Sequence, residues 1–268
     1  MNSCSASESV NLKVIWSMAN TVAIELRRLT FQYPNGRLAL GEITCSIPTG
    51  ERIAVVGPSG AGKSTLLMHL NGLLPAPSIT SDDRAQVFVH GSAVTRERLR
   101  DIRRQVGFLF QDPDDQLFCP TVRDDVAFGP LNLGLSREEV MSRVEAGLAA
   151  VGMAECSTRN PSELSTGERK RVCLAGILAC QPAILVLDEP TSNLDPRARR
   201  QLLEILRAFQ GTLVVATHDL DFVIELCTRV LVLESGKIQA DGATERILSD
   251  PLIMDRYGLE VPWRLRKP

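Results

Sequence analysis

A glycine-rich segment at residues 57–64 has residue types and spacing that could hold phosphate groups. It reads GPSGAGKS and matches the pattern G-x-x-x-x-G-K-[ST]. Glycines let the backbone wrap closely around phosphate oxygens, so that successive N–H groups converge on the anion. The segment predicts a nucleoside triphosphate site in which Lys63 contacts the β- and γ-phosphates, Ser64 binds Mg²⁺ and Thr65 contacts a phosphate. The residues expected to line the site are Gly57, Ser59, Gly60, Ala61, Gly62, Lys63, Ser64 and Thr65.

Two carboxylates, Asp188 and Glu189, follow an apolar run at residues 184–187. One carboxylate is enough to bind Mg²⁺, and the other is then free to orient and polarise an attacking water. We therefore predict Asp188 as a metal ligand and Glu189 as the general base. An isolated Asp-Glu pair is more often a solvated strand end, but the phosphate-binding pattern upstream favours the catalytic interpretation.

The elements that must position these residues alternate between short apolar runs and helical stretches, which is typical of an α/β sheet. An early antiparallel pair is expected at residues 24–29 and 43–47, joined through a turn that contains Tyr33. Between Pro120 and Pro161 the β character disappears, which indicates a helical insert. Further strands are expected at residues 52–56, 106–110, 184–187, 212–216 and 230–233.

Two polar pairs predict helix starts. Ser136 and Glu139 form a capping box that opens a helix to about residue 150, and Ser165 and Glu168 form another that opens a helix to about residue 180. The positive end of the second helix, with the Ser165 hydroxyl and the backbone N–H groups near Gly167, is a candidate anion site.

The composition is that of a globular chain without a strong net electrostatic field. Of its 268 residues, 44% are hydrophobic and 23% charged, and the formal net charge is −2. A near-neutral chain with 4% aromatic residues has little to attract or stack on a polynucleotide, so no nucleic-acid partner is expected. The 7 cysteines are scattered without a C-x-x-C pair and are expected to be reduced thiols. No apolar run approaches the roughly 18–20 residues needed to span a bilayer, so a membrane role would require a partner.

Residues 1–20 are expected to be a disordered lead. Lys13 lies inside the weakly apolar stretch rather than before it, which disagrees with a secretory signal. The preferred interpretation is that Met18 is the true start.

With three further segments, the chain resembles an ATP-binding cassette ATPase over residues 22–243. These segments are LSTGE at 164–168, SNLD at 192–195 and THD at 217–219. The resemblance implies an α/β fold with a P-loop NTPase (RecA-like) core, an N-terminal antiparallel β subdomain and an inserted α-helical subdomain, with ATP and Mg²⁺ as ligands. The cassette is expected at residues 21–255, the insert at about 112–164 and a C-terminal tail at 256–268.

The resemblance also assigns roles to single residues. Tyr33 would stack on adenine, Gln111 would contact Mg²⁺ and water, and His218 would lie near the γ-phosphate; Asp195 is expected among the nucleotide-binding residues. Each of the first three alone has a plainer interpretation, as a turn aromatic, a surface amide and a strand-end histidine.

The LSTGE segment resembles the signature that engages the ATP of a second subunit, through Ser165 and Gly167. Compared with the usual signature, Thr166 stands where Gly is common and Glu168 where Gln is common. Both differences are expected to affect the rate of hydrolysis. One phosphate loop and one signature per chain imply that two cassettes, identical or paralogous, close around two nucleotides.

Residues 111–134 are similar to the ATPase subunits of energy-coupling factor importers, particularly the cobalt or nickel branch. The resemblance implies a motor at the cytoplasmic face of the cell membrane, with an integral transmembrane subunit and a substrate-binding membrane subunit as partners. Leu117, Phe118 and Phe128 either line the groove for the transmembrane subunit or form the insert's own small core. The acidic residues of this segment are not expected to bind cobalt or nickel, because no soft or imidazole ligand is near; they are Asp112, Asp114 and Asp115.

Other functions remain open. The ATPase could serve a vitamin importer or another ATP-binding cassette transporter. A soluble cassette acting on DNA or ribosomes is disfavoured, because such proteins usually fuse two cassettes or insert a coiled coil. A non-catalytic regulatory cassette is disfavoured because Lys63, Asp188, Glu189 and His218 are all present.

Overall fold

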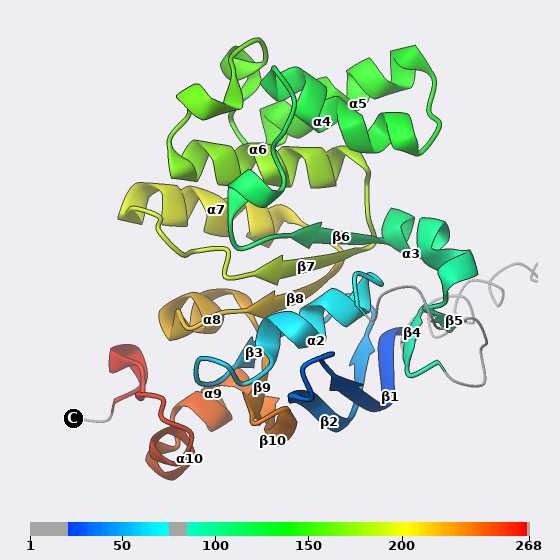
Figure 1. Ribbon diagram of the computed structural model, residues 1–268. Helices are drawn as coiled ribbons and strands as arrows, with labels where there is room; N and C mark the ends of the chain where they lie inside the picture. Colours follow the sequence, from blue (N-terminus) through cyan, green and yellow to red (C-terminus); the bar gives the residue numbers. More distant parts are fainter. Residues whose placement is uncertain (1–20, 75–84, 267–268) are drawn as a thin grey trace, which may run out of the picture.

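A six-stranded sheet of order β10-β9-β3-β8-β7-β6 forms the centre of the computed structural model, which describes residues 21–74 and 85–266 (Figure 1). The expected lead at residues 1–20 lies outside the described residues. All neighbouring strands from β9 to β6 pair in parallel, and β10 pairs with β9 antiparallel. The strands are β3 (Arg52–Val56), β6 (Val106–Leu109), β7 (Ile184–Asp188), β8 (Thr212–Ala216), β9 (Arg229–Glu234) and β10 (Lys237–Ala243).

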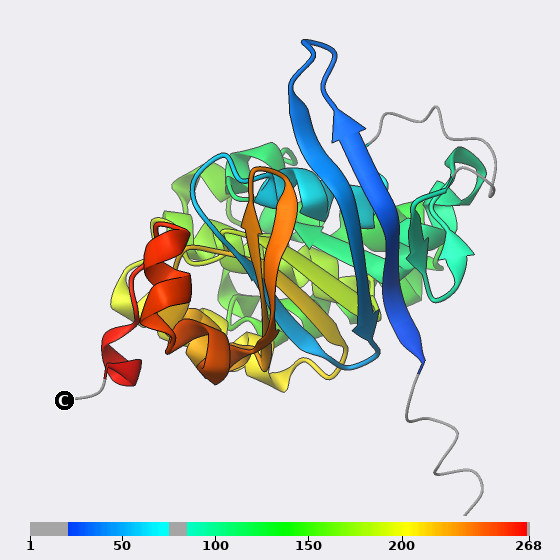
Figure 2. The same cartoon turned by 90° about the horizontal axis from the view of Figure 1, so that it is seen from below.

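A second, antiparallel sheet has the order β2-β1-β4-β5. In Figure 2, which views the molecule from below, its two long strands pass in front of the central sheet. Helix α2 (Lys63–Leu70) contributes to the apolar core that this sheet shares with the central one. The strands are β1 (Val22–Gln32), β2 (Leu38–Pro48), β4 (Val87–Val89) and β5 (Ser92–Ala93).

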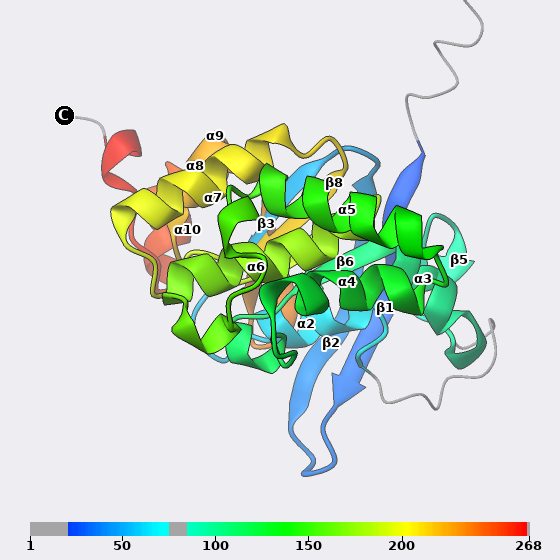
Figure 3. The ribbon, with the colours of Figure 1, turned by 90° about the horizontal axis from the view of Figure 1, so that it is seen from above.

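Three helices lie side by side over the other face of the central sheet: α4 (Val122–Asn132), α5 (Arg137–Ala150) and α6 (Thr166–Ala179) (Figure 3). Helix α6 is the innermost, because it contacts α4 and α5 as well as β6 and α7. The remaining helices are α3 (Leu99–Gln105), α7 (Pro196–Ala208), α8 (Leu220–Leu226), α9 (Thr244–Leu248) and α10 (Pro251–Arg256), with short 3₁₀ turns that include η4 (Pro113–Asp115) and η7 (Trp263–Leu265).

Central strands bury both faces, which explains their uninterrupted apolar sequences. In β7, Leu185 and Leu187 join the core under the helices, whereas Ile184 and Val186 join the core shared with the antiparallel sheet. The predicted fold class is confirmed by this arrangement of a parallel core, an antiparallel β sheet and a helical region.

Several boundaries differ from those expected. Strands β1 and β2 extend well beyond the expected residues 24–29 and 43–47, because register shifts along β1 and exposed apolar residues such as Val22 and Leu38 hide the alternation. Helix α5 begins at the predicted capping box of Ser136 and Glu139. After residue 256 the chain continues to pack on the fold, since Tyr257 is buried and Leu259, Val261 and Leu265 contact the larger core.

Replacing Leu206 with Ala should lower the free energy of unfolding by about 2–5 kcal/mol, because truncation of a buried Leu removes apolar contacts and leaves a cavity. Leu206 lies in α7 and is fully buried. Urea denaturation followed by circular dichroism measures the change. Leu252 in α10 is 82% exposed, so Leu252→Ala is the matched control and should cost less than about 0.5 kcal/mol. Equal losses in both variants would contradict the place of Leu206 in the core.

Candidate functional site

The predicted phosphate-binding loop joins β3 to α2 and needs glycine at two positions. A Cβ on Gly57 would lie 2.0 Å from the carbonyl oxygen of Leu233, and one on Gly62 would lie 2.7 Å from that of Ala39. Both glycines also have positive φ, of 148° and 104°. The loop therefore has the close-packed, N–H-rich form that can take a phosphate chain.

A hollow of about 690 Å³ opens in front of this loop and brings together most of the predicted site residues. They come from the turn after β1, the loop and first turn of α2, the end of β6, and the ends of β7 and β8. The predicted residues on its lining are Tyr33, Ser59, Gly60, Gly62, Lys63, Ser64, Thr65, Gln111, Glu189 and His218.

Lys63 lies inside its own loop. Its Nζ donates to the carbonyl oxygens of Gly57 at 2.8 Å and Pro58 at 3.0 Å. Burial lowers the pKa of Lys63, while the nearby carboxylates of Glu189 and Asp188 oppose that shift. Two other lining residues are in contact: the Tyr33 hydroxyl lies 3.0 Å from Oγ1 of Thr65.

Asp188 ends β7 as a buried carboxylate whose Oδ1 has no hydrogen-bond partner. Burial raises its pKa, and a hydrogen bond with the Ser64 side chain acts in the opposite direction. An unpartnered buried carboxylate oxygen beside a hydroxyl fits a hard cation, since Mg²⁺ takes oxygen ligands. The described residues contain no cluster of three or more His, Cys, Asp or Glu side chains that could hold a metal. A magnesium ion here would need oxygens from water and the substrate, as is usual for Mg²⁺ at phosphate sites.

Glu189 has a backbone conformation that is uncommon for a residue with a Cβ, with φ of 44°. Its side chain is held by two residues that directly follow β8. Its Oε2 accepts a hydrogen bond from Oγ1 of Thr217 at 3.2 Å and lies 2.8 Å from Nδ1 of His218. A proton on Nδ1 completes this contact and leaves Nε2 of the exposed His218 ring as the second polar atom. The three side chains form a connected polar group at the carboxyl ends of β7 and β8.

Ser165, Gly167 and Asp195 do not line this hollow. Ser165 caps α6 as expected: its hydroxyl contacts Oε2 of Glu168 at 2.8 Å, and its backbone N–H donates to the same oxygen. These hydrogen bonds lower the pKa of Glu168. Asp195 caps α7 by accepting from the backbone N–H groups of Arg197 and Ala198, each at 2.8 Å. The nucleotide-binding roles of these three residues stay predictions.

No sequence pattern predicted a role for Lys170, which the structure places in a buried position close to the site. It is only 1% exposed, although it stands within the charged run ERKR of α6. The available signal was its position one turn before Cys173 and Leu174, on the apolar side of the helix. Its neighbour Arg169 forms an ion pair with Asp114 of η4.

A groove of about 380 Å³ lies between β6, η4, α4 and α6. Its lining includes Phe110, which precedes the predicted nucleotide-site residue Gln111 in the chain. Phe118 and Phe128 line it and are 65% and 46% exposed, with ring centroids 4.8 Å apart. Leu117 also lines it but packs partly against the larger core. The core interpretation therefore fits Leu117, which packs partly against the core. It does not fit Phe118 and Phe128, which form an exposed aromatic pair.

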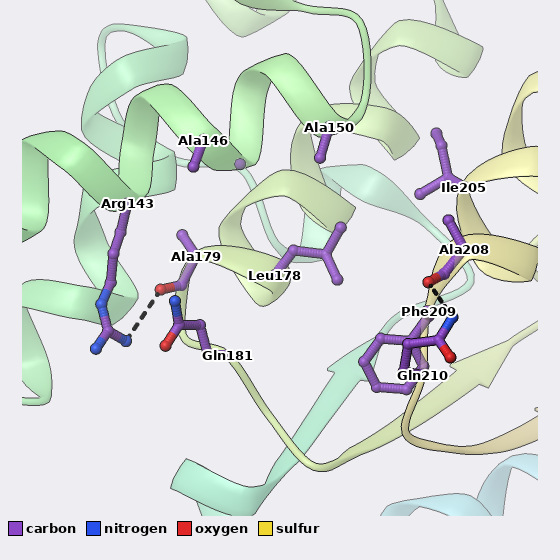
Figure 4. A pocket seen from close by; sticks show the side chains of 11 residues that line it. Arg143, Ala146, Ala150, Leu178, Ala179, Gln181, Ile205, Ala208, Phe209 and Gln210 are labelled. Atoms are coloured by element: carbon purple, nitrogen blue, oxygen red, sulfur yellow. Dashed lines mark hydrogen bonds between the residues drawn. The ribbon is translucent and has the colours of Figure 1, made fainter. Parts of the chain in front are cut away.

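Another hollow, of about 320 Å³, lies between α5 and the carboxyl ends of α6 and α7 (Figure 4). Small and apolar side chains such as Ala146, Leu178 and Phe209 point into it, and Arg143 donates to the carbonyl oxygen of Ala179 at its rim. None of the predicted site residues lines it. Its chemistry suits packing rather than catalysis.

Comparison with known proteins agrees with the geometry. The family model for ABC transporters matches residues 40–192. The chain is 44% identical over 244 residues to the energy-coupling factor transporter ATP-binding protein EcfA of Carboxydothermus hydrogenoformans, covering 90% of this chain and 88% of the relative. It is 46% identical over 244 residues to the EcfA of Methanothermobacter thermautotrophicus, covering 89% and 76%.

A solved structure of cbiO1 from Clostridium perfringens, described as part of the ABC transporter complex cbiONQ, has the same fold. Its TM-score is 0.75 at 31% identity, over 88% of this chain and 94% of that one.

Within the described residues, no helix has the length and apolar character that a bilayer crossing needs. The chain therefore belongs to the ABC transporter ATPases, the family whose characteristic activity is ATP hydrolysis.

Proposed function

We propose that this chain is the ATP-hydrolysing motor of an energy-coupling factor type importer, bound at the cytoplasmic face of the cell membrane, with cobalt or nickel ions as cargo. The observation that carries the proposal is the exposed pair Phe118 and Phe128, which lines a groove in the segment that follows Gln111. Residues 111–134 resemble the cobalt or nickel branch, and the relatives named EcfA support the importer type.

The groove suits a helix of a transmembrane subunit. Its aromatic pair offers an apolar contact that the described chain leaves in solvent, and such exposed patches typically mark interaction sites. We therefore expect the docking helix to present apolar side chains to the two phenylalanines.

Within the nucleotide hollow, the residues of this chain would divide the work of hydrolysis. The loop N–H groups and Lys63 would bind the phosphates, and Tyr33 would stack on the adenine. Ser64, Asp188 and Gln111 would hold Mg²⁺, which offsets negative charge on the phosphate oxygens. Glu189 would accept a proton from the attacking water, while Thr217 and His218 keep its carboxylate in place.

A second cassette, identical or paralogous, would complete the site. Ser165 and Gly167 lie at the first turn of α6, outside the chain's own hollow, where the positive helix end could receive the γ-phosphate of a partner's ATP. Asp195 would approach the same interface. ATP would then hold the two chains together, and hydrolysis would release them, so that the cycle can be transmitted to the membrane subunit.

Glu189→Gln should lower the rate of ATP hydrolysis at least about 100-fold, because an amide keeps the shape of the side chain but cannot take a proton. ATP binding should persist, and the variant should accumulate as an ATP-bound dimer. A phosphate-release assay and size-exclusion chromatography with ATP measure the two effects. Hydrolysis at the wild-type rate would exclude Glu189 as the base.

The membrane partners can be identified by isolating the tagged chain from detergent-solubilised membranes. Mass spectrometry should find a second cassette, an integral transmembrane subunit and a substrate-binding membrane subunit. Phe118→Asp should reduce recovery of the transmembrane subunit more than about tenfold, because it places a charge in the centre of an apolar contact. Leu252→Asp, at an exposed apolar residue that does not line the groove, should leave recovery unchanged.

Isolation with ribosomes or nucleic acid would overturn the importer assignment. Equal recovery of the transmembrane subunit with Phe118→Asp would exclude the aromatic pair as its docking contact. Uptake of radioactive Co²⁺ or Ni²⁺ by vesicles that contain the purified complex tests the cargo. Uptake of a vitamin instead, or partners typical of another ABC transporter, would assign one of the alternatives.

Mixing two inactive variants tests the shared site. Ser165→Arg blocks the anion site at the start of α6, and Lys63→Ala removes the cation that faces the phosphates. In a homodimer, each mixed pair has one complete site, because intact Lys63 and intact Ser165 lie on opposite chains. An equal mixture should regain about a quarter of the wild-type ATPase activity, since random pairing makes half of the dimers mixed.

With a paralogous partner, rescue would instead require that chain. Full activity of Ser165→Arg in the presence of its partners would show that the site is not shared between two chains.

A further inference from the structure

The ammonium group of Lys170 is enclosed by oxygens of the segment that follows β7. Its Nζ lies 3.0 Å from the carbonyl oxygen of Glu189, 3.3 Å from that of Pro190, 2.9 Å from that of Ser192, and 2.8 Å from Oγ of Ser192. These oxygens belong to backbone carbonyls and a hydroxyl, and none to a carboxylate. The contacts therefore fix a stretch of backbone rather than neutralise a charge.

All four oxygens act as acceptors toward Lys170. The Ser192 hydroxyl donates its own proton to the carbonyl of Glu189 at 2.9 Å, so its oxygen is left to accept from the lysine. An ammonium has three N–H donors and no acceptor, so its three donors are shared among the four oxygens. An apolar side chain at position 170 would leave these oxygens without the lysine as a donor.

The carbonyl of Glu189 is the most constrained of the group. It accepts from Nζ of Lys170, from Oγ of Ser192, and from the backbone N–H of Ser192 at 3.2 Å. The backbone N–H of Glu189 donates to the carbonyl of Ala216 at 2.8 Å. Both sides of the residue are thus held, at a φ of 44° that is costly for a side chain with a Cβ and persists only where surrounding contacts impose it.

Stability alone gives a weak reason for a lysine at this position. Burial lowers the pKa of Lys170, with the charges of Glu189 and Asp112 opposing the shift, so its charged form is held at a cost. Apolar residues of similar volume often replace buried charges with no loss of stability. A buried ammonium directed at the peptide that carries the predicted general base has a more specific use.

We propose that Lys170 is a positioning residue for ATP hydrolysis: it holds the Glu189 peptide so that the carboxylate faces the attacking water. The inference rests on the proposed role of Glu189 as the base. Because Lys170 stands in α6, it also ties that base to the helix whose first turn begins at Ser165. A displacement of α6 when two cassettes close is then passed directly to the Glu189 carbonyl.

The test replaces Lys170 with Met, which keeps the length and apolar stem but removes all three donors. In the full chain with its co-purified partners, kcat should fall at least tenfold, while KM for ATP stays within about twofold. Lys170→Gln retains two N–H donors and should lose less activity than Lys170→Met.

Leu148→Ala is the control for lost stability, because Leu148 is buried in α5, in the same core as the apolar side of α6. Its kcat should stay within about twofold of the wild type when assayed below its unfolding transition. An equal fall in kcat for Leu148→Ala and Lys170→Met would assign Lys170 a merely structural role.

A double-mutant cycle with Glu189→Gln identifies the residue through which Lys170 acts. If Lys170 only positions the carboxylate, Lys170→Met should slow the wild type strongly and leave the residual rate of Glu189→Gln nearly unchanged. Equal fold-losses in both backgrounds, or an unchanged kcat in Lys170→Met alone, would overturn the proposal.

Failure of both Lys170 variants to fold would also overturn it, since Lys170 would then be needed for the fold itself. A wild-type rate in Glu189→Gln alone would instead remove the premise about the base. None of these results bears on the membrane partner, which is tested separately by co-purification.

Discussion

Parallel pairing of β3, β8 and β7 is the constraint on which the candidate site depends. Strands that run in the same direction end at the same edge of the sheet, so the segments that follow them must meet there. The glycine loop follows β3, Asp188 and Glu189 end β7, and Thr217 and His218 follow β8. The contact of Glu189 with Thr217 and His218 exists because these two strands are neighbours, although the residues are 28 and 29 positions apart in the chain.

Much of this arrangement was predictable because its signals are local. The glycine loop is a short pattern with a steric reason at Gly57 and Gly62, and the capping boxes at Ser136 and Ser165 each involve residues three positions apart. The central strands were recognised because a strand buried on both faces is an uninterrupted apolar run. In each of these cases, one stretch of sequence contains the whole physical cause of the structure.

The features that escaped prediction have causes outside their own segment. Lys170 looks like part of a solvated charged run, and only the oxygens of residues 189–192 explain why it is buried. The outer parts of β1 and β2 lack a regular alternation of polar and apolar residues and are ordered by pairing with each other. The exposure of Phe118 and Phe128 depends on how α4 lies against its neighbours, so the sequence left a groove and a local core equally open.

Helix α6 connects the regions that a transport motor would need to couple. Its first turn carries Ser165, Arg169 pairs with Asp114 next to the groove, and Lys170 holds the Glu189 peptide. All three residues lie within the six positions from the N-cap Ser165 to Lys170, so a rigid displacement of α6 moves the proposed signature, groove and base together. A well-packed helix transmits such a displacement because its interior contacts cannot yield gradually. The position of the Glu189 carboxylate is therefore expected to depend on whether a second cassette and a membrane helix are in place.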